Sequence, residues 1–142
     1  MIHPIMAQEK MQNKLQEAAI KVGIGDPGEK ILNAISLSSK QTGLSQELLL
    51  SLMHTESSMN SQAVSSKHYQ GLMQIPKSDL LMHKEEDVNT LIGARILLEK
   101  LALTKGSLKE AIVLYKGWKI TDSEGKRQAD KVLALMKKLR EV

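Results

Sequence analysis

A central stretch of the chain, residues 46–75, reads QELLLSLMHTESSMNSQAVSSKHYQGLMQI and joins two contrasting parts. The first part carries apolar residues at helical spacing, and Ser45 just before it is a suitable N-cap. The second part is rich in Ser, Asn and Gln, and a glycine interrupts it. We therefore predict a helix that ends near Thr55 or Ser57, followed over residues 58–78 by an irregular segment with a short β-hairpin.

Glu56 occupies an unusual place in this predicted helix. It follows Leu49, Leu52 and Met53 by seven, four and three residues, so helical geometry puts it on the core-facing side. Burial and the negative end of the helix dipole both disfavour a carboxylate, so they would raise its pKa and prepare it as a general acid for a glycosidic bond. In the alternative interpretation, the helix frays before Glu56 and the side chain points into water.

Outward from this stretch, the sequence predicts further helices and one compact domain. Gly43 is placed to end the second helix, Asp87 to cap the fourth, and Ser107 with Glu110 forms a capping-box pattern before the fifth. The predicted helices span residues 8–22, 29 to about 40, 46 to 55 or 57, 88–103, 107–115 and 127–140. The fold class is thus mainly α, with residues 1–28 as an N-terminal helical arm and turn and residues 29–142 as the main domain.

Composition excludes several classes of protein. The 142 residues include no cysteine, which excludes disulfides, zinc–thiolate sites and a cysteine nucleophile. No run approaches the roughly 20 apolar residues of a membrane-spanning helix. The net charge of +4 favours anionic partners, but the basic residues are spread over several helices without a cluster of aromatics, so we expect no nucleic-acid binding. No spacing of His and carboxylates indicates a metal site, and His54 is expected to be a surface or partly packed side chain.

The segment that follows Glu56 resembles the catalytic segment of the lytic transglycosylases with the SLT, or goose-lysozyme-like, domain. In that family a Glu-Ser pair ends a helix, a Ser follows nine residues after the Glu, and a Gly-Leu-Met-Gln motif places its Gln eighteen residues after it. In this chain Ser65 lies nine residues after Glu56, and Gln74 of Gly71-Leu-Met-Gln74 lies eighteen residues after it. Both spacings therefore agree with the family without an insertion or deletion.

The resemblance continues downstream and covers about residues 29–142. Asn89-Thr-Leu-Ile-Gly93-Ala-Arg-Ile-Leu97 is similar to a helix of the family, and Ala111-Ile-Val-Leu-Tyr115-Lys116-Gly117 is similar to its Ala-x-x-x-Tyr-Asn-x-Gly motif. Tyr115 matches the active-site tyrosine. Counting back from Val132-Leu133 places Glu124 at the glutamate of a C-terminal motif, although the aromatic residue of that motif is missing here.

The resemblance implies a lysozyme-like helical fold and cleavage of the β-1,4 bond between N-acetylmuramic acid and N-acetylglucosamine in peptidoglycan. It implies Glu56 as general acid and then base, with formation of a 1,6-anhydro ring and without any cofactor or metal. The substrate-binding residues that it implies are Ser65, Tyr69, Met73, Gln74, Tyr115 and Glu124. Leu72 and Met73 also have a purely structural interpretation, as side chains that fill the core beneath a turn at Gly71.

Three departures from the family pattern keep other functions open. His68-Tyr69 stands where the family has Gly-Ala, Pro76 where a Met is common, and Lys116 where an Asn follows the tyrosine. A goose-type hydrolase would need a second carboxylate; we interpret Asp79 and Glu85-Glu86-Asp87, the nearest candidates, as a solvated loop and a helix cap. The other alternative is a glycan-binding module with reduced or no catalysis.

The biological setting follows only from the implied substrate. Met1 to Lys10 has neither the basic start nor the apolar stretch of a secretory signal. We therefore expect a monomer that acts in the periplasm or at the cell wall without membrane insertion. Its route there would be other than a standard leader, with phage, secretion or conjugation machinery as a partner.

Overall fold

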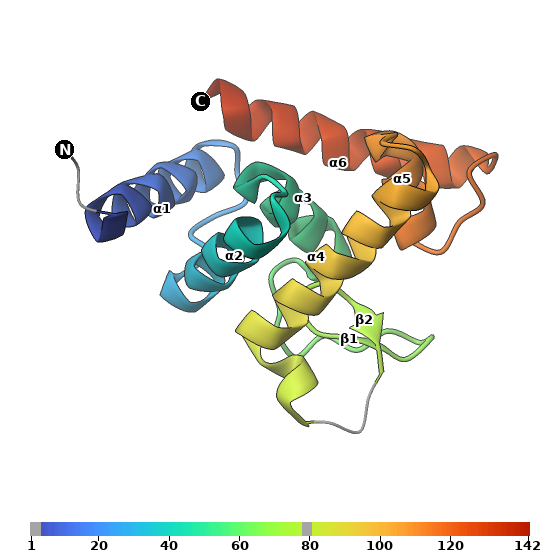
Figure 1. Cartoon of the computed structure of the whole chain (residues 1–142), viewed down its shortest axis with the longest axis horizontal. Coiled ribbons are helices and arrows are strands. Elements are labelled where there is room, and N and C mark those ends of the chain that lie inside the picture. The colour runs from blue at the N-terminus through green and yellow to red at the C-terminus, as the bar shows by residue number, and fades with distance from the viewer. Residues whose placement is uncertain (1–3, 78–80) are drawn as a thin grey trace.

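The computed structural model describes residues 4–77 and 81–142 and shows a mainly helical domain with one small β-hairpin (Figure 1). Its elements in chain order are α1 (Pro4–Lys21), α2 (Glu29–Thr42), α3 (Gln46–Ser57), β1 (Tyr69–Gln70), β2 (Ile75–Pro76), a 3₁₀ turn (Leu81–Lys84), α4 (Glu86–Leu103), α5 (Leu108–Tyr115) and α6 (Ser123–Glu141). The predicted fold class, a lysozyme-like helical domain with a short hairpin after α3, is confirmed.

Local capping chemistry explains most of the helix ends. Gly43 adopts a left-handed φ of 77° and its N–H donates to the carbonyl of Ser39, as expected for a glycine that ends a helix. The Ser45 hydroxyl accepts from the Leu48 N–H and begins α3, and the Ser107 hydroxyl accepts from the Glu110 N–H and begins α5. These predicted caps are confirmed.

Three predicted helix starts are wrong. The first helix begins at Pro4 rather than at residue 8, with proline at the first helical position, where its missing N–H costs no intrahelical bond. Asp87 lies inside the first turn of α4, because the N-cap position falls on Glu85, whose side chain makes no capping bond. The last helix begins at Ser123 rather than Arg127, because the Asp122 carboxylate accepts from two backbone N–H groups, those of Glu124 and Gly125.

A single hydrophobic core joins all six helices to the hairpin region. Its centre is α3, where every residue from Leu48 to Met53 is buried, and α6 lies across α3 and α5 (Figure 1). The N-terminal arm contributes to the same core through Leu15, Ala18 and Ala19. The irregular stretch between α3 and the 3₁₀ turn, described over residues 58–77 and called the hairpin segment below, contributes Leu72, Met73 and Ile75. Within the described residues, no helix is both long enough and apolar enough to span a membrane.

Candidate active site

Glu56 lies in the last turn of α3, which continues to Ser57, so the helix does not fray before it. Its side chain is only 15% exposed, as the apolar stripe of the helix predicts. Burial raises the pKa of the Glu56 carboxyl, and the neighbouring charge of Lys116 acts in the opposite direction without cancelling it. Immediately afterwards, Ser58 and Met59 both take left-handed backbone conformations, with φ of 51° and 65°, and turn the chain away from the helix.

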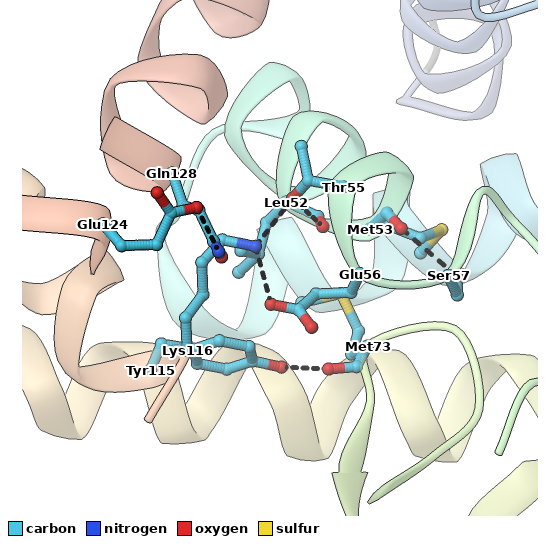
Figure 2. Close-up of polar contacts among 10 residues, drawn as sticks. All are labelled: Leu52, Met53, Thr55, Glu56, Ser57, Met73, Tyr115, Lys116, Glu124 and Gln128. Atoms are coloured by element: carbon cyan, nitrogen blue, oxygen red, sulfur yellow. Dashed lines mark hydrogen bonds and ion pairs between the residues drawn. The ribbon is translucent and has the colours of Figure 1, made fainter. Parts of the chain in front are cut away.

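Lys116, at the end of α5, forms an ion pair with Glu56 (Figure 2). The Lys116 Nζ donates to Glu56 Oε1 at 2.9 Å and to Thr55 Oγ1 at 3.1 Å, and the lysine side chain is only 6% exposed. The Thr55 hydroxyl in turn donates to the carbonyl of Leu52. Among the side chains that the structure describes, Lys116 is the only charged group in contact with Glu56.

Tyr115 lies beside Glu56 and is tied to the hairpin segment. Its hydroxyl donates to the carbonyl of Met73 at 2.6 Å, and burial together with the charge of Glu56 raises its pKa well above the ordinary value for tyrosine (Figure 2). Gly93 of α4 permits this arrangement, because a Cβ there would approach Met73 Cβ to 2.5 Å and the Tyr115 hydroxyl to 2.9 Å. A glycine is therefore required for α4 to pack this closely.

Asn89 of α4 anchors the hairpin segment through hydrogen bonds to its backbone. Its Oδ1 accepts from the Met73 N–H at 2.8 Å, and its Nδ2 donates to the carbonyls of Gln70 and His83 at 3.0 and 2.8 Å. The side chain is fully buried, and Gly71 leaves the room for it, since a Cβ at Gly71 would lie 2.1 Å from Asn89 Nδ2. Two backbone groups of the hairpin segment and one of the 3₁₀ turn thus find their partner in one amide.

Ser65 and Gln74, both predicted to bind substrate, organise the loop itself. The Ser65 hydroxyl accepts from the Tyr69 N–H, which leaves its own proton available. Gln74 Nε2 donates to the carbonyls of Ala63 and Gly71, and no intramolecular donor to its amide oxygen is seen in the described part of the chain. Each residue therefore combines a structural contact with one free hydrogen-bonding group.

The remaining predicted binding residues occupy different positions. Tyr69, on β1, is 39% exposed, whereas the Met73 side chain has no exposed surface, in line with its structural interpretation as part of the core. Glu124 lies in the first turn of α6, bound to Arg127 and Gln128, and these contacts lower its pKa to about 2. In the view of Figure 2 it lies beyond Gln128 and Lys116, away from Glu56.

A surface hollow of about 400 Å³ opens beside the ion pair. It is lined by residues from the ends of α3 and α5 and the start of α6, namely His54, Thr55, Lys116, Arg127, Gln128 and Lys131. His54 is half-buried, and its Nδ1 is buried without a hydrogen-bond partner. Cationic and polar groups thus line the hollow on the α6 side of the ion pair, and Glu56 itself is not part of its lining.

The alternative carboxylates lie elsewhere or outside the described residues. Glu85, Glu86 and Asp87 line a different hollow, with Lys30 and Asn33 of α2. Asp79 falls in the segment that the structure does not describe. Within residues 4–77 and 81–142, no cluster of three or more His, Asp or Glu residues could hold a metal ion.

A family model of the transglycosylase SLT domain matches residues 33–132. The chain belongs to this family. The resemblance inferred from the spacing around Glu56 is therefore confirmed, and SLT membership indicates an enzyme of the lytic transglycosylase class that acts on cell-wall peptidoglycan. Among curated proteins, none shows a significant match to this chain.

Sequence reasoning missed two residues of this SLT site. In the sequence, Lys116 differs from the family pattern without indicating a partner, and its contact with Glu56 spans 60 residues, so no local spacing reveals it. Asn89 belongs to a helical motif that does not by itself indicate its role. A buried asparagine in a predicted helix is a usable signal, because a polar side chain on an apolar face needs partners.

Proposed function

We propose that the chain cleaves the β-1,4 bond between N-acetylmuramic acid and N-acetylglucosamine, with Glu56 as the single acid and base. The observation that carries this proposal is the position of Glu56, nearly buried at the end of α3 with a raised pKa. A carboxyl group in such an environment stays protonated to higher pH than an exposed one, which a proton donor requires. Membership of the SLT family indicates that the substrate is peptidoglycan.

The proposed reaction has two proton transfers and consumes no water. Protonated Glu56 donates its proton to the glycosidic oxygen, the bond from that oxygen to C1 of the muramoyl sugar breaks, and the N-acetylglucosamine part leaves as an alcohol. The substrate's own N-acetyl group stabilises the positive charge that develops at C1, so that no second carboxylate is needed. The Glu56 carboxylate then takes the proton of the C6 hydroxyl as O6 bonds to C1, closing the 1,6-anhydro ring and restoring the acid.

The surrounding residues would orient the sugar rather than react with it. The free proton of Ser65 and the free amide oxygen of Gln74 are suited to bind sugar hydroxyl and acetamido groups, and the exposed ring of Tyr69 is suited to pack on a sugar face. Tyr115 would act from beside Glu56, with Met73 supporting it from the core. Glu124, held by Arg127, would contact a more distant part of the strand.

The contacts of Glu56 favour this reaction over hydrolysis. An inverting hydrolase needs a second carboxylate that activates water, at a separation of about 6.5–9.5 Å from the acid. Among the described side chains, the charged partner of Glu56 is an ammonium group and not a carboxylate. The products decide between the two reactions.

The test is mass spectrometry of fragments released from purified peptidoglycan by the wild type, Glu56→Gln and Glu47→Gln. Glu47→Gln is a matched control, because it makes the same change at the opposite end of α3. We expect fragments ending in 1,6-anhydro-muramic acid from the wild type and the control. Release by Glu56→Gln should fall by at least about 10²–10⁴-fold, the usual contribution of a general acid.

Each other outcome has a definite meaning. Reducing muramic acid ends would show hydrolysis, and equal release by Glu56→Gln would exclude Glu56 as the acid. Binding of glycan strands without any fragments would show a glycan-binding module. For the setting, we propose action in the periplasm or at the cell wall beside phage, secretion or conjugation machinery.

A further inference from the structure

The ion pair between Lys116 and Glu56 is unusually well enclosed for a lysine contact. The lysine side chain is 6% exposed, and two of its three ammonium protons have fixed acceptors, Glu56 Oε1 and Thr55 Oγ1. Thr55 can only accept from Lys116, because its own proton goes to the carbonyl of Leu52. The ammonium is therefore held in one place relative to the carboxyl group.

The charged groups around Glu56 come from three helices. On α3 the titratable residue that lines the hollow beside the pair is His54, and α5 supplies Tyr115 and, at its C-cap, Lys116. The hollow beside the pair adds Arg127 and Lys131 of α6, and Arg127 is already bound to Glu124. The hairpin segment contributes the Met73 carbonyl to Tyr115. Lys116 is thus the group whose charge acts most directly on Glu56.

We propose that Lys116 is a positioning residue for Glu56: its ammonium fixes one carboxylate oxygen, favours the ionised carboxylate against the effect of burial and confines turnover to more acidic conditions. This inference rests on the proposed function for its catalytic part, since it assumes that Glu56 is the proton donor. Its structural part concerns only the ionisation of Glu56 and can be measured without substrate. The site thereby differs from one with an uncharged residue after the tyrosine.

The pair has opposite effects on the two proton transfers. A neighbouring positive charge makes Glu56 a stronger acid toward the glycosidic oxygen, and it makes the resulting carboxylate a weaker base toward the C6 hydroxyl. Because the donor must be protonated at the start, activity falls as the pH rises through the pKa of Glu56. Removing the charge should move that alkaline limit to higher pH.

The experiment combines an NMR titration of the Glu56 carboxyl carbon with the pH profile of kcat/KM on peptidoglycan. The variants are Lys116→Met, which keeps the chain length without the charge, Lys116→Arg, which keeps the charge, and Lys119→Met as control. Lys119 is exposed on the loop after α5, and its side chain makes no hydrogen bond or ion pair with the residues that the structure describes. A thermal scan at each pH establishes that every variant is folded.

We expect Lys116→Met to raise the pKa of Glu56 by about 1–3 units, the usual effect of an opposite charge at this range. The alkaline limit of kcat/KM should move to higher pH by the same number of pH units. At a pH above both limits, each unit corresponds to about a tenfold higher kcat/KM than in the wild type. For Lys116→Arg, both the pKa of Glu56 and the pH profile should stay close to the wild type. An unchanged pKa of Glu56 in Lys116→Met would overturn the inference. An equally large shift in the pKa of Glu56 in Lys119→Met would also overturn it, because the shift would then reflect the net charge of the protein and not the contact with Lys116.

Failure of the proposed function gives a different pattern. If the wild type releases no fragments at any pH, the catalytic role of Glu56 is refuted, whereas the NMR titration still decides whether Lys116 favours the ionised carboxylate. If fragments are released and the titration shifts but the pH profile does not, Glu56 is not the donor that limits the rate, and the positioning role is refuted.

Discussion

Replacing Asn89 with alanine tests whether one buried amide holds the hairpin segment beneath the active site. The change removes three hydrogen bonds, two buried ones with the Met73 N–H and the Gln70 carbonyl and a partly buried one with the His83 carbonyl. Each lost bond costs about 1 kcal/mol of unfolding free energy, and the groups left unpaired add part of their desolvation cost. The better helix propensity of alanine returns about 0.5 kcal/mol. The net loss of unfolding free energy is therefore about 3 kcal/mol. For a domain of this size that corresponds to a fall in Tm of about 10 °C.

The assay is urea and thermal unfolding of Asn89→Ala beside Asn33→Ala. Asn33 is also helical, but it is exposed and its side chain makes a single surface bond with Gln12, so this variant measures the change in helix propensity together with the loss of one exposed bond. A loss of less than about 1 kcal/mol for Asn89→Ala, or a loss equal to that of Asn33→Ala, would refute the anchoring role. Below its transition the variant should also cleave peptidoglycan more slowly, because Tyr115 depends on the Met73 carbonyl for its position.

Two other predictions follow from the packing and charge of the site. Gly93→Ala should lower the unfolding free energy by about 1–3 kcal/mol despite the better helix propensity of alanine, because its Cβ would press on Met73 and the Tyr115 hydroxyl; a rise in Tm would contradict the close packing. The pKa of Glu124 is lowered to about 2. Its pair with Arg127 therefore stabilises the folded state at pH values above the ordinary pKa of glutamate, and this contribution disappears as the pH falls from about 4.5 toward 2. Thermal scans of Glu124→Gln should therefore lie slightly below the wild type at neutral pH and coincide with it at the acidic end; a constant gap would show that the carboxylate charge is not responsible. The effect should be small and sensitive to salt, because the pair is exposed.

The helices could be predicted because their signals are local. Ser45, Gly43 and Ser107 act within one turn of the helix ends that they mark, and apolar spacing identifies the buried faces. The start of α6 was missed because its periodic apolar residues begin later than its cap, Asp122, which binds two backbone N–H groups ahead of them. Helix ends depend on such single contacts more than on the pattern.

The site was predictable only in part. The burial of Glu56 follows from its spacing within one helix, and the roles of Ser65 and Gln74 in the loop are compatible with their register. The partner of Glu56 could not be predicted, because the contact with Lys116 depends on where the end of α5 lies relative to the end of α3. Contacts between elements far apart in the sequence follow from tertiary packing and leave no periodic trace.

The contribution of α1 and of the end of α6 to the core sets the size of the unit that can be transferred between proteins. The region shared with the family spans residues 33–132, yet Leu15 and Ala19 on one side and Leu139 on the other are buried in the same core. An exchange of only the shared region would leave apolar faces of α2 and α3 open to water, with a risk of aggregation. A chimaera that transplants this activity should therefore carry both flanking helices as part of the inherited module.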